Sequence, residues 1–358
     1  MRFAFLIPLI FCLSTYGQQD LSNRNYFKKF FRSDSAKNLL IIGENHASEA
    51  GSVIYPSLVK YLNKKSGLHA LLIEFGPSEA YWYTKYLETG NEKHLNYTLY
   101  AGGIKGWREA WREIYAYNKT LKKPLRIIGI DFDRTRTLAY ALFSIFKSYD
   151  TVPAYIQPLL EEIKTDKFYK SYTIGYPNKK DIEWMSKTKQ LLRQHLPELT
   201  IFLKKKDLTF VNEILSNQAV NYADGREEAL AANTKRIIEN SMEKNFLLLI
   251  GRNHTYINPL IANKKTMANI LVDSSSINIR TGAILFENSI LSTTKDKTIT
   301  LFEISGKSPW KRHYAILNKK AKKNLTVVPL TGDLCSLSHY IDFTIIGRNL
   351  KQNENLNN

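Results

Sequence analysis

The chain has 358 residues, 44% of them hydrophobic, and this length can bury a large core in one domain or in two. Its formal net charge is +18, to which lysine-rich clusters at 204–206 and 319–323 contribute. We expect a solvated basic surface and no nucleic-acid partner, because the chain begins with an export signal. Attraction to anionic polymers of the cell envelope is the alternative use of this charge.

Residues 1–17 have the pattern of a secretory signal peptide. A positive start, an apolar run over 3–13 and small residues before Gly17 predict cleavage after that glycine. The run is too short to span a bilayer, so no transmembrane segment is expected in the mature chain. The protein is therefore predicted to be exported, and to be periplasmic or secreted. Loss of Cys12 with the signal would leave Cys335 alone, which excludes an intramolecular disulfide.

Short apolar segments alternate with helical patterns through the first third of the chain, and the alternation returns later. Continuous apolar strands between helices indicate a mainly parallel sheet that helices cover on both faces. The fold class predicted here is therefore α/β, with a mainly parallel central sheet flanked by helices. The expected strands are 39–42, 70–73, 126–130 and 246–250, and the expected helices are 52–63, 79–87, 107–119 and 224–240.

The middle of the chain, about 152–217, contains no convincing strand. Its patterns predict two charged helices at 180–195 and 197–215, the second opened by Pro197, where a missing N–H costs nothing. We interpret this region as a helical insertion in a single α/β domain that extends over 18–348. Further strands are expected at 278–286, 298–303 and 326–330, and the polar tail 349–358 is predicted to be disordered.

Four of the predicted strands end in polar residues of catalytic type. The sequence Gly-Glu-Asn-His at 43–46 follows the first strand, Gly-Arg-Asn-His at 251–254 follows the last, and Glu74 and Asp131 end the two between them. Chance predicts roughly 0.3 Gly-x-x-His matches in such a composition, so two matches directly after strands are informative. Because the carboxyl ends of parallel strands share one edge of the sheet, these side chains are expected to converge there. The expected cluster consists of Glu44, His46, Glu74, Asp131 and His254.

Histidines and glutamates gathered at one edge are suited to more than one chemistry. A neutral histidine can take a proton from water while a carboxylate orients it, and a second histidine can bind or protonate an oxyanion or leaving group. Two histidines and two glutamates can instead hold a divalent metal that activates water. Arg226, taken alone, is more typical of a surface charge. No Gly-x-Ser-x-Gly elbow is present, so a serine hydrolase of the α/β type is not supported.

These motifs resemble the superfamily that joins erythromycin esterase-like proteins, Tiki (TraB) proteins and ChaN haem-binding iron-uptake proteins. The likeness covers about 38–286. Residues 43–46 resemble the first motif of the family, and Glu74 its strand-end glutamate. The other matching stretches are 107–118 with 128–131, which ends in Gly-x-Asp; 226–233, which resembles an Arg-Asp-x-x-Met-Ala-x-Asn helix with Glu227 and Leu230 substituted; and 251–254, the last histidine motif.

The resemblance implies a hydrolase that uses His46 as the general base, oriented by Glu44 or Glu74. His254 and Arg226 would complete the site and stabilise the oxyanion. The implied substrate is an ester or amide, either a small molecule or an envelope component, and this interpretation requires no cofactor.

The first motif also departs from the erythromycin esterases. They usually separate the glutamate and the histidine by two residues, whereas here only Asn45 lies between Glu44 and His46. This spacing is closer to the Tiki and ChaN types and argues against macrolide specificity. A ChaN-like haem- or iron-binding uptake protein and a Tiki-like metal-dependent peptidase therefore stand as alternatives, with haem or a divalent metal as their cofactor.

Overall fold

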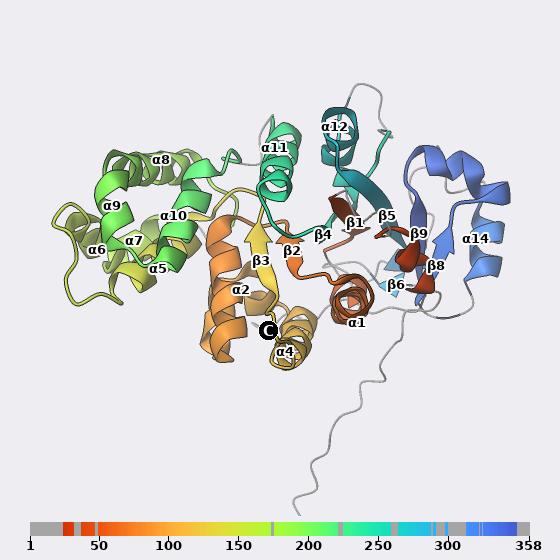
Figure 1. Ribbon diagram of the computed structural model, residues 1–358, viewed down its shortest axis with the longest axis horizontal. Coiled ribbons are helices and arrows are strands. Elements are labelled where there is room, and N and C mark those ends of the chain that lie inside the picture. Colours follow the sequence, from red (N-terminus) through yellow and green to blue (C-terminus); the bar gives the residue numbers. More distant parts are fainter. Residues whose placement is uncertain are drawn as a thin grey trace, which may run out of the picture.

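Seven strands form a central sheet in the order β3-β2-β4-β1-β5-β9-β8. The computed structural model describes residues 24–31, 37–46, 49–172, 175–220, 225–258, 264–287, 289–290, 298–299, 313–321, 323 and 325–348. Neighbouring strands are parallel, except that β8 is antiparallel to β9 at one edge. Helices flank this sheet (Figure 1), which confirms the predicted α/β fold. The strands are β1 Asn38–Glu44, β2 Ala70–Ile73, β3 Arg126–Gly129, β4 Asn245–Gly251, β5 Asn278–Glu287, β8 Leu325–Pro329 and β9 Phe343–Arg348.

Parts of the sequence-based description need correction or lie outside the described residues. Strand β9 was not predicted, and the expected strand at 298–303 is described only at β7, Thr298–Ile299, which pairs with β6, Ser289–Ile290. The predicted signal peptide and polar tail fall outside the described ranges. Within those ranges, no helix is both long enough and apolar enough to cross a membrane.

Alternate residues of the central strands face opposite sides of the sheet, and helices cover both sides. Leu40 and Leu247 point into the core beneath α1 and α4, whereas Leu39 and Leu248 point toward α11 and α12. Figure 1 shows these helices on opposite faces. The α-helices outside the helical region described next are α1 Glu49–Ser66, α2 Pro77–Thr89, α3 Leu99–Gly103, α4 Lys105–Asn118, α11 Arg226–Glu239, α12 Met267–Ser274 and α14 Tyr314–Lys320, and the 3-10 helices are η1 Arg24–Lys29, η2 Glu92–Tyr97, η3 Arg252–His254 and η4 Gly332–His339.

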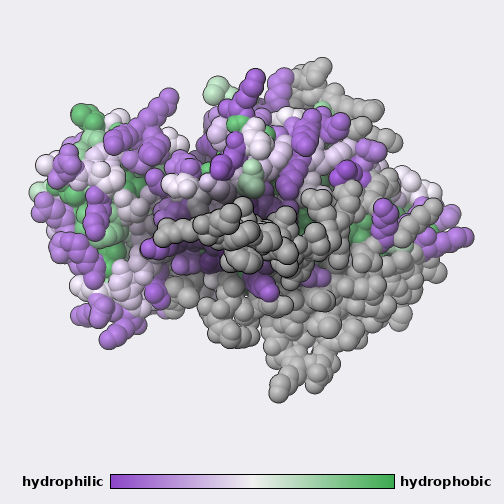
Figure 2. All heavy atoms as spheres, turned by 90° about the horizontal axis from the view of Figure 1, so that it is seen from below, coloured by the Kyte–Doolittle hydropathy of each residue, from purple (hydrophilic) through white to green (hydrophobic). Residues whose placement is uncertain are grey.

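A group of helices with its own apolar core lies beside the sheet, at the left of Figure 1. The pattern over 197–215 predicted one helix, but the structure has two, because the chain is extended at Leu203 and Lys204. The backbone N–H of Lys204 donates to the hydroxyl of Tyr149 (2.8 Å), which fixes this break. Figure 2 shows polar side chains over most of the described surface on one face, with apolar ones gathered over this group. Its helices are α5 Thr135–Phe146, α6 Gln157–Ile163, α7 Asp166–Ser171, α8 Lys179–Gln194, α9 Leu196–Phe202 and α10 Lys205–Ser216.

The register of the central strands brings the two Gly-x-x-His motifs together. In this register Glu44 of β1 lies opposite Gly251 of β4, and Ile73 of β2 lies opposite Leu249 of the same strand. The chain therefore leaves β1, β2 and β4 at the same edge and at nearly the same level. The residues that follow these strands must lie side by side, whatever their distance in sequence.

Candidate active site

Glu44 and His46 form a pair at the end of β1. The Nδ1 atom of His46 is 2.5 Å from Oε1 of Glu44, in hydrogen-bond contact. The glutamate side chain is only 2% exposed, whereas that of the histidine is 41% exposed. A carboxylate that accepts a hydrogen bond from Nδ1 fixes the tautomer of the imidazole and leaves Nε2 free to exchange a proton. The one-residue spacing of this motif therefore places a buried carboxylate behind an accessible histidine.

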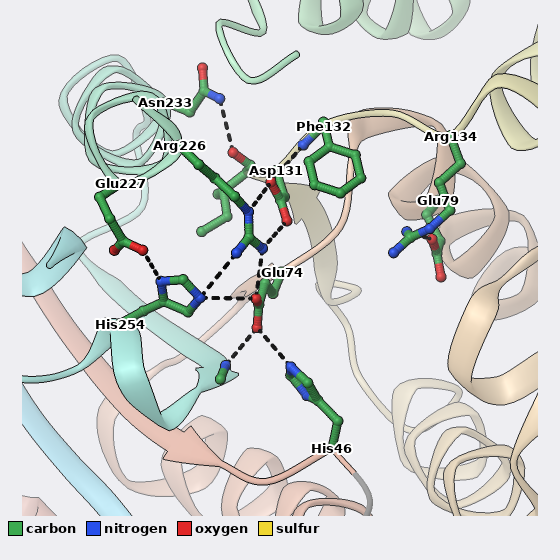
Figure 3. Close-up of polar contacts among 12 residues, drawn as sticks. His46, Glu74, Glu79, Asp131, Phe132, Arg134, Arg226, Glu227, Asn233 and His254 are labelled. Carbon is green, nitrogen blue, oxygen red and sulfur yellow. Dashed lines mark hydrogen bonds and ion pairs between the residues drawn. The ribbon is translucent and has the colours of Figure 1, made fainter. Parts of the chain in front are cut away.

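Glu74, directly after β2, is the residue on which both motifs converge (Figure 3). Its Oε2 accepts a hydrogen bond from the backbone N–H of Gly251 (2.5 Å) and lies 3.5 Å from Nε2 of His46. Its Oε1 accepts from Nη2 of Arg226 (2.8 Å) and lies 3.3 Å from Nε2 of His254. Burial acts to raise the pKa of Glu74, but the hydrogen bond from His254 and the surrounding cationic groups outweigh it. The pKa is held well below its usual range, so Glu74 is anionic at neutral pH.

Arg226 is the first residue of α11, and its guanidinium forms a fork around Asp131. Its Nε and Nη2 atoms lie 3.2 Å and 2.5 Å from the two carboxylate oxygens, while Nη1 is 3.2 Å from Nε2 of His254. Gly225 precedes the helix as its N-cap with a φ of 86°, which is easily adopted only by glycine, and the turn places the arginine at the sheet edge. Burial raises the pKa of Asp131 and Arg226 opposes that effect. Because a guanidinium stays charged, we describe the two as an ion pair.

His254 is enclosed by charged groups on the opposite side of Glu74 from His46. Its Nδ1 lies 2.6 Å from Oε1 of Glu227, an ion-pair contact rather than a well-aligned hydrogen bond. The other carboxylate oxygen of Glu227 accepts from the backbone N–H of Met267 (2.7 Å), at the start of α12. Burial acts to lower the pKa of His254, but Glu227 and Glu74 outweigh it and raise the pKa to about 9. The ring is therefore mainly protonated at neutral pH.

The site has two unlike halves that meet at Glu74. On one side, the side chains of Arg226 and His254 are only 9% and 11% exposed, and protein groups surround them. On the other side, the exposed ring of His46 borders a cavity of about 30 Å³ between the sheet edge, α1 and α4. The His46 side is therefore the half of the site that is more open to solvent. The cavity is lined by Glu44, His46, Tyr55, Ile73, Glu74, Phe75, Tyr83, Tyr100, Trp107, Trp111 and Leu249.

The structure brings together all five residues proposed from the sequence, namely Glu44, His46, Glu74, Arg226 and His254. Asp131, which the strand-end pattern also placed in the expected cluster without a catalytic role, lies in the site and binds Arg226. The structure also places Glu227 in the site, beside His254, whereas the sequence had marked this residue only as a departure from the family motif. The sequence signal for Glu227 was its place beside Arg226 in the first turn of a predicted helix. No feature of the sequence predicted the aromatic cavity.

The donor arrangement does not fit a divalent metal. In the described part of the chain, no group of three or more histidine, cysteine, aspartate or glutamate side chains is arranged to hold one. The carboxylates of Glu74 and Asp131 both bind Arg226, whose positive charge would have to be displaced before a cation could enter. Glu44 is directed to the Nδ1 atom of His46.

Comparison with known proteins supports the fold. No family model and no curated sequence matches the chain. A protein from Bacillus cereus matches with a TM-score of 0.63 and 15% identity over 93% of each chain. A succinoglycan biosynthesis protein has a TM-score of 0.63 and 14% identity, covering 92% of this chain and 91% of its own.

A mutant of the erythromycin esterase EreC in its open conformation is also similar. It has a TM-score of 0.55 and 15% identity, and the match covers 92% of this chain and 94% of that one. The chain therefore shares the α/β fold of these three proteins, the fold that its motifs predicted.

Proposed function

We propose that the protein is an exported hydrolase that cleaves an ester or amide bond, with His46 as the general base. The observation that carries the proposal is the pairing of an accessible histidine with a buried carboxylate, 2.5 Å from its Nδ1. This arrangement orients the imidazole and stabilises the charge that it acquires when it takes a proton. The substrate is a small molecule or an envelope component.

The proposed reaction moves one proton through His46. Nε2 takes a proton from a water molecule as the water oxygen attacks the carbonyl carbon. The tetrahedral intermediate then expels the alcohol or amine, which receives the proton from Nε2–H. Glu44 stabilises the transient imidazolium at Nδ1. The carboxylate of Glu74, 3.5 Å from Nε2, adds a second negative charge near the ring. No covalent enzyme intermediate is required.

Arg226 and His254 serve this reaction by holding Glu74 in position. The Nε and Nη2 atoms of Arg226 donate to Asp131 and Glu74. An oxyanion would have to compete with these two carboxylates for the same donors. We therefore assign Arg226 and His254 as positioning residues, in place of the oxyanion role that the family resemblance implies.

The protonation state of His46 gives the proposal a pH signature. Burial acts to lower its pKa, but Glu44 and Glu74 outweigh burial and raise the pKa above 6.5. A base acts only when deprotonated, so kcat/KM is expected to rise as the pH increases through the pKa of His46, which lies above 6.5. Glu44→Gln removes the charge that contributes most to raising this pKa. The rise in kcat/KM should therefore occur at lower pH in that variant.

Hydrolysis of a panel of nitrophenyl esters and anilides by the full chain tests the proposal. His46→Ala should abolish turnover while the circular dichroism spectrum and the melting temperature are retained. His339→Ala, which removes an exposed histidine on η4, is the matched control and should keep full activity. Turnover that survives in folded His46→Ala would refute the role of His46.

The same preparation separates the two alternatives. Activity that a chelator removes and added Zn²⁺ restores would favour a metal-dependent peptidase. A Soret band on titration with haem, without ester turnover, would favour a haem-binding uptake protein.

A further inference from the structure

Two buried asparagines hold the end of β3, the strand at one edge of the sheet. This strand ends at Gly129, and the backbone carbonyls of the next two residues accept hydrogen bonds from side chains. The Nδ2 atom of Asn233 donates to the carbonyl of Ile130 (2.9 Å), and that of Asn217 donates to the carbonyl of Asp131 (2.8 Å). A buried carbonyl without a partner costs free energy, so these two amides stabilise the chain where it leaves the sheet.

The two asparagines also bind each other and the adjoining backbone. Nδ2 of Asn233 donates to Oδ1 of Asn217 (2.7 Å), which also accepts from the backbone N–H of Ala219 (3.1 Å). Oδ1 of Asn233 accepts from the backbone N–H of Gln218 (3.1 Å). Asn217 directly follows α10, whereas Asn233 belongs to α11. The pair therefore joins the end of the helical group to α11 and to the end of β3.

The backbone of Asp131 is held at both of its polar groups. Its N–H donates to the carbonyl of Phe75 (3.0 Å), and its carbonyl accepts from Asn217 (2.8 Å). Its carboxylate binds Arg226, which lies about two turns before Asn233 on the same face of α11 (Figure 3). Helix α11 thus contacts the end of β3 at two points, through an arginine at this carboxylate and an asparagine at the preceding carbonyl.

Asn217 also contacts the segment that leads to the helix after Glu74. Its Nδ2 lies 3.4 Å from Oδ2 of Asp133, and Oδ1 of Asp133 accepts from the backbone N–H of Ser78 (2.8 Å), in the first turn of α2. Glu74 lies just before that helix. One asparagine therefore contacts the segments on both sides of the buried carboxylates of the site.

We propose that Asn217 and Asn233 are positioning residues of the active site. By fixing the end of β3, they keep the carboxylate of Asp131 on the guanidinium of Arg226. That guanidinium holds Glu74 beside the histidine that acts as the general base. The inference rests on the proposed function, and it makes the end of the helical group part of the support of the site.

Asn118 provides a matched control at the other end of β3. It is 7% exposed, as Asn217 is, and its Oδ1 accepts from the backbone N–H of Leu125 (2.8 Å), directly before the strand begins. Asn→Ala at either position removes a buried amide that holds the backbone next to the same strand. Both variants should have a lower melting temperature than the wild type, but only Asn217→Ala changes the end of the strand that leads to Asp131.

Hydrolysis of the nitrophenyl ester that the wild type cleaves fastest tests the proposal. Asn217→Ala and Asn233→Ala should each lower kcat about tenfold to a hundredfold with little change in KM, because a misplaced catalytic group slows the chemical step. The double variant should lose no more than the weaker single variant, since both amides hold one strand end. Wild-type kcat in folded Asn217→Ala, an equal loss in Asn118→Ala or losses that multiply in the double variant would overturn the inference.

Titration of His46 tests the same arrangement without turnover. The carboxylates of Glu44 and Glu74 raise the pKa of His46, whereas burial and His254 lower it. Asn217→Ala removes part of the support of Glu74, so the pKa of His46, followed by NMR of the histidine-labelled full chain, should fall in that variant and stay unchanged in the control. An unchanged pKa in both variants would overturn the inference. A wild type without turnover would refute the hydrolase function and leave this titration to decide the positioning role.

Discussion

Raising the pH from 6.5 to 9 is expected to destabilise the folded protein through His254. Burial opposes the charged ring, but the carboxylates of Glu227 and Glu74 outweigh burial and raise the pKa from 6.5 to about 9. The folded state therefore holds this proton more tightly than the unfolded chain does. The stabilisation is complete below about pH 6.5 and is lost as the pH rises through about 9.

The size of the effect follows from the shift. One pKa unit corresponds to about 1.4 kcal/mol, so the rise of the His254 pKa from 6.5 to about 9 corresponds to about 3 kcal/mol. Solvent screens little of this, because the side chain is only 11% exposed. Total stabilities of proteins are on the order of 5–15 kcal/mol, so a change of this size is readily measured.

Urea unfolding of the wild type and of His254→Gln, at several pH values between about 6 and 10, isolates the contribution of this histidine. The difference between their free energies of unfolding should shrink by about 3 kcal/mol across the range. Glu227→Gln removes one of the two carboxylates that raise the pKa, so its own pH dependence should be weaker than that of the wild type. A constant difference between wild type and His254→Gln would refute the reasoning, since the ring would then bind its proton equally in both states.

Two further substitutions probe the geometry of the site. Arg226→Met removes the cation that pairs with two buried carboxylates and should cost about 3–5 kcal/mol in denaturant unfolding; unchanged stability would contradict the ion-pair description. Gly251→Ala would place a methyl group 3.2 Å from Nε2 of His46, and a displacement of that ring should lower kcat by about tenfold to a hundredfold with the fold retained. Gly103→Ala, whose added Cβ meets no atom within 4 Å, is the control, and an equal effect there would reject the steric argument.

The strand-end part of the site was predictable from the sequence because it depends on only two regularities. Apolar runs of strand length marked β1, β2 and β4, and parallel strands expose their carboxyl ends at one edge. Neither regularity requires knowledge of how the helices pack. Glu44, His46, Glu74 and His254 therefore converge as expected.

The remaining features depend on tertiary packing, which no local pattern encodes. The position of Arg226 is set by the way α11 lies on the sheet, and its sequence context alone was typical of a surface charge. The side chains of Trp107 and Tyr55 come from α4 and α1, and they line one cavity only because these helices pack side by side on one face. The spacing of apolar residues predicts that such helices exist, but not which of their side chains meet.

Among the polar groups of the site, charge and exposure make His46 the one best suited to the proton exchange that the proposed function requires. Glu74 is too weak a base, because its pKa is held far below neutrality. His254 stays protonated to about pH 9, and its side chain is 11% exposed. Arg226 is charged throughout and faces protein groups. His46 alone among these four combines a 41% exposed side chain with a pKa above 6.5, so it can take up and release a proton where a substrate can reach it.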